Sequence, residues 1–307
     1  METDNTARLF PGFEDRWIDL ESTRIFTRTG GPDGAPVVLL IHGFPQSHLC
    51  WHPIAADLAK THRVVCLDLK GYGRSATPSG DRAHREYSKR MWARECVAAM
   101  SELGHDRFAV VGHDRGAQVA YRMALDSPER IGKLAILDNL PIHIVWELID
   151  ANPGYLPWWE MMARPAPEPE NIMTADYIEE LVAGASATQS VDIFHPAVLE
   201  EYRRNWADPS HVHAYCEDYR AGAGPDVIAD KDDIDAGRRI ECPVLVLCSK
   251  LVFGKADEQP VDVWRRTFAP DVRGKLLDCG HFLTEEKPEE TLAELSGFLD
   301  SADGKAS

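Results

Sequence analysis

The sequence predicts an α/β fold in which a mostly parallel, doubly wound sheet carries an inserted helical segment. Short, continuous apolar runs alternate with helical patterns through the first half of the chain, and the same alternation resumes after a gap at 142–235. The chain has 307 residues, of which 44% are hydrophobic. This length and composition suffice for one large core and an inserted subdomain.

Six apolar runs have the pattern of strands that are buried on both faces, as the strands of parallel sheets are. They are VVLLIHG from residue 37, RVVCLDLKG (63–71), FAVVGHDRG (108–116), KLAILDNLP (133–141), PVLVLCSK (243–250) and GKLLDCGHF (274–282). Helical patterns near 51–60, 90–103 and 116–126 separate the first four runs. Strands that alternate with helices predict parallel neighbours joined by crossover helices.

The gap between the fourth and fifth runs differs in composition from the rest of the chain. Residues 142–235 are rich in Trp, Tyr, Met and Pro, have the pattern of short helices and contain no buried-strand run. We expect them to form a helical lid on a core domain made of 1–141 and 236–307. The biased stretch ARPAPEPEN (163–171) is expected to be a linker within this lid.

Charge and cysteine content exclude several classes of protein. The formal net charge of -17 disfavours binding to nucleic acid or anionic membranes. The seven cysteines are scattered and form no CxxC pair, so neither a disulfide framework nor a zinc site is expected. The polar N-terminus and the lack of a long apolar stretch argue against secretion and membrane anchoring. We expect a cytoplasmic protein that acts on a small molecule.

The segment around Asp114 has the pattern of a nucleophile elbow. Gly112-His113-Asp114-Arg115-Gly116 lies between a buried-strand run and an amphipathic helical pattern, with Asp where esterases carry Ser. The two glycines suit a strained turn in which larger side chains would collide with neighbouring elements. An Asp here could merely cap the helix, but a cap does not explain the motifs that accompany it. We expect Asp114 to be the nucleophile.

The HGFP motif at 42–45 is expected to supply an oxyanion hole. After its strand, this turn would aim the Phe44 N–H at the site, and the Arg115 N–H would be the second donor. Asp68, in the loop DLKGYGRS (68–75), is expected to have a structural role.

His281, in CGHF after the last run, stands where the base of an Asp–acid–His triad belongs in chain order. Two acids could orient it. Asp138 ends its strand, whereas Asp257 lies on a longer loop. An acid that holds the imidazole tautomer needs a short, rigid support, and this favours Asp138.

Together these motifs resemble the fluoroacetate (haloacetate) dehalogenase family of the α/β-hydrolase superfamily, with wider similarity to epoxide hydrolases and haloalkane dehalogenases. The resemblance covers nearly the whole chain and is carried by HGFPQ (42–46), GHDRGAQ (112–118), ILDNLP (136–141), PAPEPEN (165–171), CEDYRAGA (216–223), PVDVW (260–264) and CGHFLTEE (279–286). It implies an α/β-hydrolase fold, no metal and no organic cofactor. The resemblance further implies that Asp114 displaces halide, Arg115 binds the substrate carboxylate, Asp138 supports His281, and Tyr219 helps to hold the halide.

Two positions depart from the family pattern. Gln118 replaces a second carboxylate-binding arginine, and Trp158-Trp159 replaces a His-Trp pair in the halide pocket. Arg115 and Gln118, three apart on one helix, should face the same side, so a carboxylate would meet one cation and one amide. The two indoles could hold halide with Tyr219, or they could simply pack the lid. This pocket should suit chloride or bromide better than fluoride.

Two other functions compete with dehalogenation. An epoxide hydrolase would use the same Asp114 and His281, with Tyr219 and Tyr215 as lid acids. A non-catalytic binding protein would require a degraded nucleophile or base, and neither is degraded here. The expected assembly is a homodimer.

Overall fold

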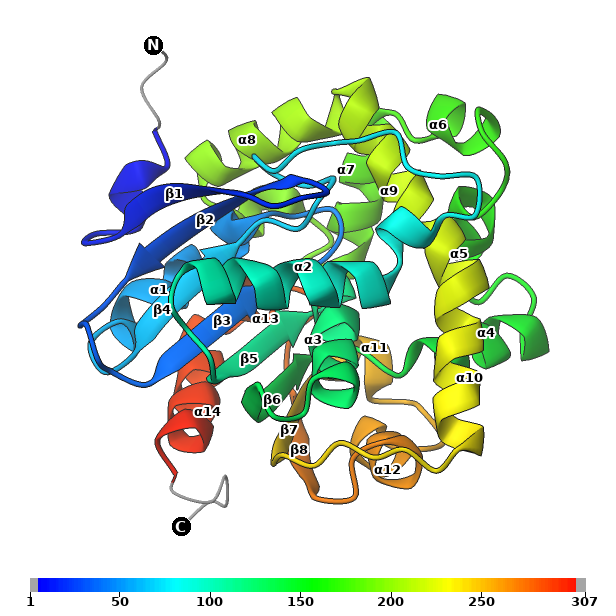
Figure 1. Cartoon of the computed structure of the whole chain (residues 1–307). Coiled ribbons are helices and arrows are strands. Elements are labelled where there is room, and N and C mark those ends of the chain that lie inside the picture. Colours follow the sequence, from blue (N-terminus) through cyan, green and yellow to red (C-terminus); the bar gives the residue numbers. More distant parts are fainter. Residues whose placement is uncertain (1–4, 302–307) are drawn as a thin grey trace.

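The structure, a computed structural model, describes residues 5–301 and is built on one sheet of eight strands (Figure 1). The strand order is β1-β2-β4-β3-β5-β6-β7-β8. The strands are β1 (Glu14–Asp19), β2 (Arg24–Gly30), β3 (Val37–Ile41), β4 (Arg63–Leu67), β5 (Phe108–His113), β6 (Ile131–Leu137), β7 (Val244–Ser249) and β8 (Val272–Leu277).

Strands β3 to β8 coincide with the six apolar runs and pair in parallel. The central strands are buried as the continuous apolar pattern requires: Val38, Leu39, Leu40 and Ile41 of β3 have no exposed surface. The edge strand β8 is the exception, because its middle residues are partly or fully exposed. The predicted fold class is therefore confirmed. Because the strands β3 to β8 are parallel, their carboxyl ends lie at the same end of the sheet. The loops that carry the candidate site residues begin there.

The sequence patterns did not reveal the antiparallel pair β1 and β2. Strand β1 forms the edge of the sheet, and five of its six residues are exposed. Strand β2 joins the pair to β4, also in antiparallel orientation. A polar edge strand lacks the apolar signature of a buried strand, and its charged side chains protect the open edge from further pairing.

The helices outside the segment between β6 and β7 pack around the sheet, and we call them the core helices. Helices α2 and α3 pack against each other in front of the strands in Figure 1, and α1 packs against α14. The core helices are α1 (His52–Leu58), α2 (Lys89–Glu102), α3 (Arg115–Asp126), α11 (Lys250–Phe253), α12 (Pro260–Thr267), α13 (Leu283–Glu286) and α14 (Pro288–Asp300), with short 3-10 turns η1 (Ala7–Leu9), η2 (His48–Trp51) and η3 (Arg85–Tyr87).

The chain between β6 and β7 is helical and contains no strand among the described residues. It forms the green-to-yellow part of Figure 1. Its elements are α4 (Ile142–Ala151), α5 (Pro157–Met162), α6 (Glu168–Ile172), α7 (Ala175–Ala185), η4 (Val191–Ile193), α8 (Pro196–Trp206), α9 (Pro209–Ala221), the π-helical turn η5 (Gly222–Asp226) and α10 (Val227–Asp235).

Over residues 5–301, no helix combines the length and the apolar character that a membrane crossing requires. All seven cysteines are free thiols.

Candidate active site

Asp114 lies in a strained turn between β5 and α3. Its backbone has φ 48° and ψ −116°, outside the regions that L-residues favour. The turn closes because its flanking residues lack side chains. A Cβ on Gly112 would collide with the backbone of Gly116, and a Cβ on Gly116 would collide with the carbonyl oxygens of Ile41 and His42. The G-x-D-x-G pattern therefore brings the elbow directly onto the end of β3.

The two oxygens of the Asp114 carboxylate have different surroundings. Oδ1 accepts a hydrogen bond from the Phe44 N–H at 2.8 Å. Oδ2 lies 3.9 Å from Nε2 of His281. Within residues 5–301, the Arg115 N–H makes no hydrogen bond to this carboxylate, so Phe44 is its one backbone donor here. The amide of Asn139 holds the turn itself, because its Nδ2 donates to the Asp114 carbonyl at 3.0 Å.

His281 is paired with Asp138 and not with Asp257. Nδ1 of His281 lies 2.6 Å from Oδ2 of Asp138. The Asp138 carboxylate is fully buried, and its Oδ1 accepts the Ser249 N–H at 2.5 Å. Ser249 ends the strand next to that of Asp138, so the acid is supported from two adjacent strands. This is the short, rigid support that an orienting acid needs.

The charges around His281 favour its protonated form. Burial alone would lower the pKa of His281, but the hydrogen bond and charge of Asp138, together with the charge of Asp114, raise it to about 9. The raised pKa of His281 favours an imidazolium at neutral pH. Loss of the Asp114 charge would remove one of the contributions that raise the pKa.

His113, the residue before Asp114, holds the loop that carries His281. Its Nε2 donates to the His281 carbonyl at 2.8 Å. Burial and the neighbouring His281 lower the pKa of His113 to about 4, so it stays neutral. From the other side, the His281 N–H donates to the Ala185 carbonyl at the end of α7 at 2.9 Å. The base is thus positioned by a core strand and an inserted helix together.

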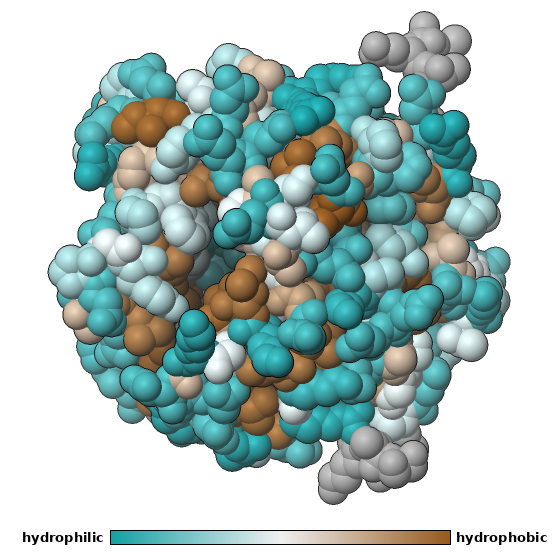
Figure 2. All heavy atoms as spheres, turned by 180° about the vertical axis from the view of Figure 1, so that it is seen from behind, coloured by the Kyte–Doolittle hydropathy of each residue, from teal (hydrophilic) through white to brown (hydrophobic). Residues whose placement is uncertain are grey.

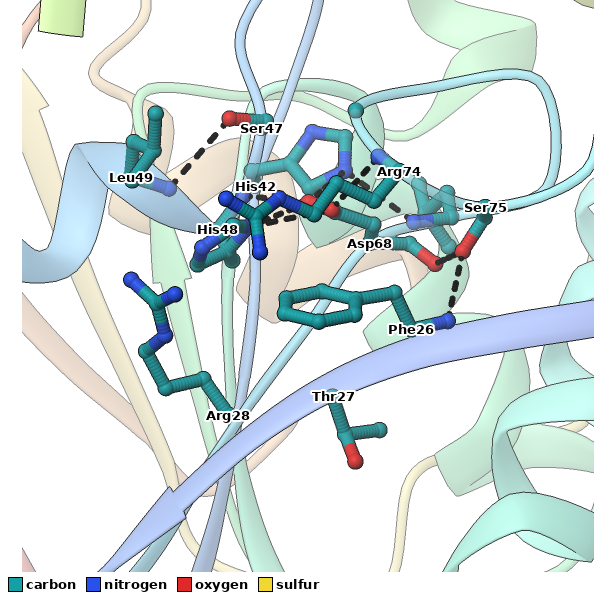
Figure 3. A network of polar contacts seen from close by, with 12 residues as sticks. Phe26, Thr27, Arg28, His42, Ser47, His48, Leu49, Asp68, Arg74 and Ser75 are labelled. Carbon is teal, nitrogen blue, oxygen red and sulfur yellow. Dashed lines mark hydrogen bonds and ion pairs between the residues drawn. The ribbon is translucent and has the colours of Figure 1, made fainter. Parts of the chain in front are cut away.

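Asp68 lies at the centre of a buried network beneath this site (Figure 3). It accepts hydrogen bonds from the N–H groups of His48 at 2.6 Å and Arg74 at 2.9 Å. Nε2 of His42 accepts the Leu69 N–H at 3.1 Å, so the HGFP turn is tied to the same loop. Burial alone would raise the pKa of Asp68, but the His48 ring holds it well below its usual range. These contacts make Asp68 a structural anchor for the HGFP turn.

A cavity of about 530 Å³ opens beside Asp114. Figure 2 shows that one face of the molecule is hollowed, with hydrophobic side chains gathered beside the hollow. Seven of the site residues that the sequence predicts line the cavity: Phe44, Asp114, Asp138, Trp158, Trp159, Tyr219 and His281. No arginine or lysine of the described chain is among the lining residues. Tyr215 is not among them either; its hydroxyl is buried without a hydrogen-bond partner.

Arg115 and Gln118 come together, as expected for residues three apart on one helix, and neither is among the residues that line the cavity. Nη1 of Arg115 donates to Oε1 of Gln118 at 3.0 Å, and both side chains are fully buried. The guanidinium carbon lies 3.6 Å from the ring centre of Tyr219 and 4.1 Å from that of Trp159. Arg115 is thus stacked against two rings that themselves line the cavity.

The Arg115 guanidinium still has free donors. Nε and Nη2 have no hydrogen-bond partner among the described residues, and neither has Nε2 of Gln118. The nearest acid, Asp218 of α9, lies 3.6 Å from Nε, beyond hydrogen-bond distance. Buried donors are normally satisfied, so these three mark a place that a ligand or water would complete.

Three supporting residues were missed by the sequence analysis: Asn139, His113 and Ser249. Asn139 and His113 directly follow or precede predicted site residues, and this adjacency was a signal that could have found them. Ser249 ends a predicted strand, but its partnership with Asp138 depends on strand order. Over residues 5–301, no group of three or more His, Cys, Asp or Glu side chains is placed to hold a metal ion.

Comparison with known proteins places these features in a family. The model of the alpha/beta hydrolase fold family matches residues 36–223. The chain is 39% identical over 298 residues to a fluoroacetate dehalogenase from Burkholderia sp., with 96% of each chain covered. It is 28% identical to a soluble epoxide hydrolase from Corynebacterium sp. (strain C12), over 83% of this chain and 87% of that protein.

Two solved structures are similar to this chain over most of its length. A protein of Pseudomonas aeruginosa described as an epoxide hydrolase has a TM-score of 0.86 at 38% identity, covering 94% of this chain and 96% of the other. A protein from Nostoc sp. PCC 7120 described as an alpha/beta hydrolase has a TM-score of 0.87 at 40% identity, covering 94% of this chain and 99% of the other.

Proposed function

We propose that this chain, which belongs to the α/β-hydrolase family, hydrolyses 2-haloacids through a covalent ester on Asp114. The chain is a hydrolase that resembles fluoroacetate dehalogenases over most of its length. The geometry around Asp114 and Arg115 supports the more specific reaction and substrate.

In the first half-reaction, Oδ2 of Asp114 attacks the carbon that bears the halogen. Oδ2 is the free oxygen, because Oδ1 is held by the Phe44 N–H. A carbon–oxygen bond forms as the carbon–halogen bond breaks, and the halide leaves with the bonding electron pair. This displacement needs no base, so an imidazolium at His281 does not hinder it.

In the second half-reaction, water hydrolyses the ester. Esterification removes the Asp114 charge, which lowers the pKa of His281 and lets the ring give up its proton to solvent. Neutral His281 then takes a proton from water, whose oxygen adds to the Asp114 carbonyl carbon. Oδ1 becomes the oxyanion against the Phe44 N–H. Collapse breaks the ester bond, and the departing alkoxide takes the proton that His281 removed from water, which yields the 2-hydroxyacid and the Asp114 carboxyl group.

The free donors of Arg115 are the observation that favours an acid substrate. A fully buried guanidinium, whose Nε and Nη2 have no hydrogen-bond partner and whose Nε lies 3.6 Å from the Asp218 carboxylate, lies against the cavity-lining rings of Trp159 and Tyr219. A carboxylate that reached between these rings would satisfy both donors with charge-assisted hydrogen bonds. Gln118 would add a neutral donor through Nε2.

Trp158, Trp159 and Tyr219 are the proposed halide site. All three line the cavity, and burial raises the pKa of Tyr219, which keeps its hydroxyl a donor at neutral pH. Neither indole N–H forms a hydrogen bond within the described residues. Indoles are weaker donors to a strongly hydrated fluoride ion than a charged histidine, so we expect chloride and bromide to leave faster than fluoride.

Epoxide hydrolysis is the second candidate, because two tyrosines from separate inserted segments line the cavity. Tyr155 precedes α5, and Tyr219 lies on α9. This pair replaces the Tyr215–Tyr219 pair of the sequence analysis, and either hydroxyl could protonate an epoxide oxygen above Asp114.

We further propose that the segment 142–235 acts as the lid of this site, and that the enzyme is a cytoplasmic homodimer. The lid helices α4, α5, α7 and α9 contribute to the cavity wall. Sedimentation equilibrium should return twice the 34.3 kDa mass of one chain; a mass of one chain would refute the dimer.

The test is halide release from fluoro-, chloro- and bromoacetate, with bromoacetamide as a neutral control and styrene oxide as the rival substrate. We expect bromoacetate and chloroacetate to be turned over faster than fluoroacetate, and bromoacetamide to have a much higher KM than bromoacetate. Turnover of styrene oxide without halide release from any haloacid would select the epoxide hydrolase instead.

A further inference from the structure

The cavity is much larger than a haloacetate. Its volume of about 530 Å³ falls within the roughly 300–1,000 Å³ typical of sites for drug-sized ligands. A haloacetate has only a handful of non-hydrogen atoms. With its carbon at Asp114 and its carboxylate toward Arg115, it would occupy the inner end and leave most of the space to water.

Most of the rest of the wall is apolar, and its polar exceptions are Glu180 of α7 and Asn139. Leu148 and Leu156 come from the α4–α5 region, Leu181 from α7, and Leu251 and Val252 from α11. Leu251 and Val252 are 56% and 44% exposed, so they stand where the cavity meets solvent. Apolar side chains that remain exposed around an opening are typical of a groove that binds an apolar group.

One position on this wall leaves open space. Gly184, near the end of α7, lines the cavity, and a Cβ added there would meet no atom within 4 Å. The helix would accept a side chain at this position without a backbone clash. The chain thus carries its smallest residue where a larger one would shorten the cavity.

We propose that the preferred substrate is a 2-haloacid whose reacting carbon carries a large apolar group, such as a phenyl ring. This proposal rests on the proposed function. The ring fills the space between α7, α11 and the α4–α5 region. Asp114 displaces the halide as described, and the product is the corresponding 2-hydroxyacid. Because an apolar pocket gains about tenfold or more in discrimination for each methylene-sized group that it buries, a phenyl ring should improve binding at least that much.

The first measurement uses the unaltered enzyme and two unreactive acids. Phenylacetate and acetate are tested as competitive inhibitors of bromoacetate turnover, so that differences in intrinsic reactivity play no part. We expect phenylacetate to inhibit at a concentration roughly tenfold or more below that of acetate. Equal inhibition constants would overturn the proposal.

The second measurement compares Gly184→Phe with the matched control Gly297→Phe. Gly297 lies on α14, away from the cavity, and a Cβ there also meets no atom within 4 Å. Gly184→Phe should lower the ratio of kcat/KM for 2-bromo-2-phenylacetate to kcat/KM for bromoacetate by about tenfold or more. Gly297→Phe should leave this ratio unchanged.

The outcomes separate this proposal from the proposed function. If bromoacetate is turned over but Gly184→Phe affects both substrates equally, the substrate class is wrong and the dehalogenase function stands. If neither haloacid releases bromide, both are wrong.

Discussion

At the scale of single residues, the central feature is that the two carboxylate oxygens of Asp114 have different contacts. Oδ1 is bound to the Phe44 N–H, and Oδ2 faces both the cavity and His281. The same side chain can therefore act as nucleophile through one oxygen and present the other to the oxyanion hole. In the proposed mechanism, His281 acts only after the ester exists, because displacement by a carboxylate needs no base.

Replacement of His281 by Gln should trap the alkyl-enzyme. Displacement at carbon needs no base, but hydrolysis of the ester does, so the variant should stop after one halide per chain. Intact mass spectrometry after incubation with bromoacetate should show the protein heavier by one carboxymethyl group. Asp114→Asn, incubated in parallel, should show no such addition. An inactive His281→Gln protein of unshifted mass would contradict the assigned role.

His281 also predicts how stability depends on pH. Its pKa is raised from 6.5 to about 9 in the folded protein, so folding favours the protonated ring. This contribution to stability is fully present below pH 6.5 and is lost as the pH rises through about 9. Urea unfolding midpoints between pH 6 and 10 should fall more steeply for the wild type than for His281→Gln. Parallel curves would show that the His281 pKa is not raised.

At the scale of elements, the inserted helix α9 is joined to α2 through buried charged side chains. Nζ of Lys89, on α2, lies 2.5 Å from Oδ1 of Asp218 and 3.2 Å from Oδ2 of Asp226. The Tyr72 hydroxyl donates to Oδ2 of Asp218 at 2.6 Å, and the same oxygen lies near Arg115. The CEDYRAGA motif thus carries both a cavity residue, Tyr219, and the acid that balances the charge of Arg115.

Lys89→Met should destabilise the protein strongly, because it leaves Asp218 and Asp226 buried with less compensation. Removing one partner from a buried ion pair costs about 3–5 kcal/mol of unfolding free energy. The matched control is Lys231→Met, whose ion pair with Asp235 on α10 is exposed and should contribute little. Urea unfolding of both variants measures the difference. Equal midpoints for the two variants would contradict the role given to Lys89.

At the scale of the whole molecule, the net charge of -17 opposes an anionic substrate. Long-range repulsion by this net charge slows the approach of an anionic substrate, whereas Arg115 attracts the substrate only at short range. Salt screens the long-range repulsion more than the short-range attraction. kcat/KM for bromoacetate should therefore rise when sodium sulfate is added at low ionic strength. Bromide release from neutral bromoacetamide should stay constant under the same additions. A fall for bromoacetate would indicate that local attraction governs association.

The parts of the molecule that local patterns encode were predictable from the sequence. Continuous apolar runs identified β3 to β8, and the motifs around Asp114 and His281 placed these residues after the correct strands. The exposed edge strand β1 has no such pattern. The burial of Arg115 against Trp159 and Tyr219 depends on how α9 and α5 pack over α3, which spacing along the chain does not encode. For the same reason, the sequence could not show that Tyr155, and not Tyr215, shares the cavity with Tyr219.

The most direct test of the covalent route is a single turnover in water enriched in heavy oxygen. Hydrolysis at the Asp114 carbonyl carbon transfers the water oxygen to the enzyme, so peptide mass spectrometry should find the label in the peptide that contains Asp114. The product of that first turnover should contain none. A labelled product with an unlabelled Asp114 peptide would mean that water attacks the substrate directly, and the covalent mechanism would be wrong.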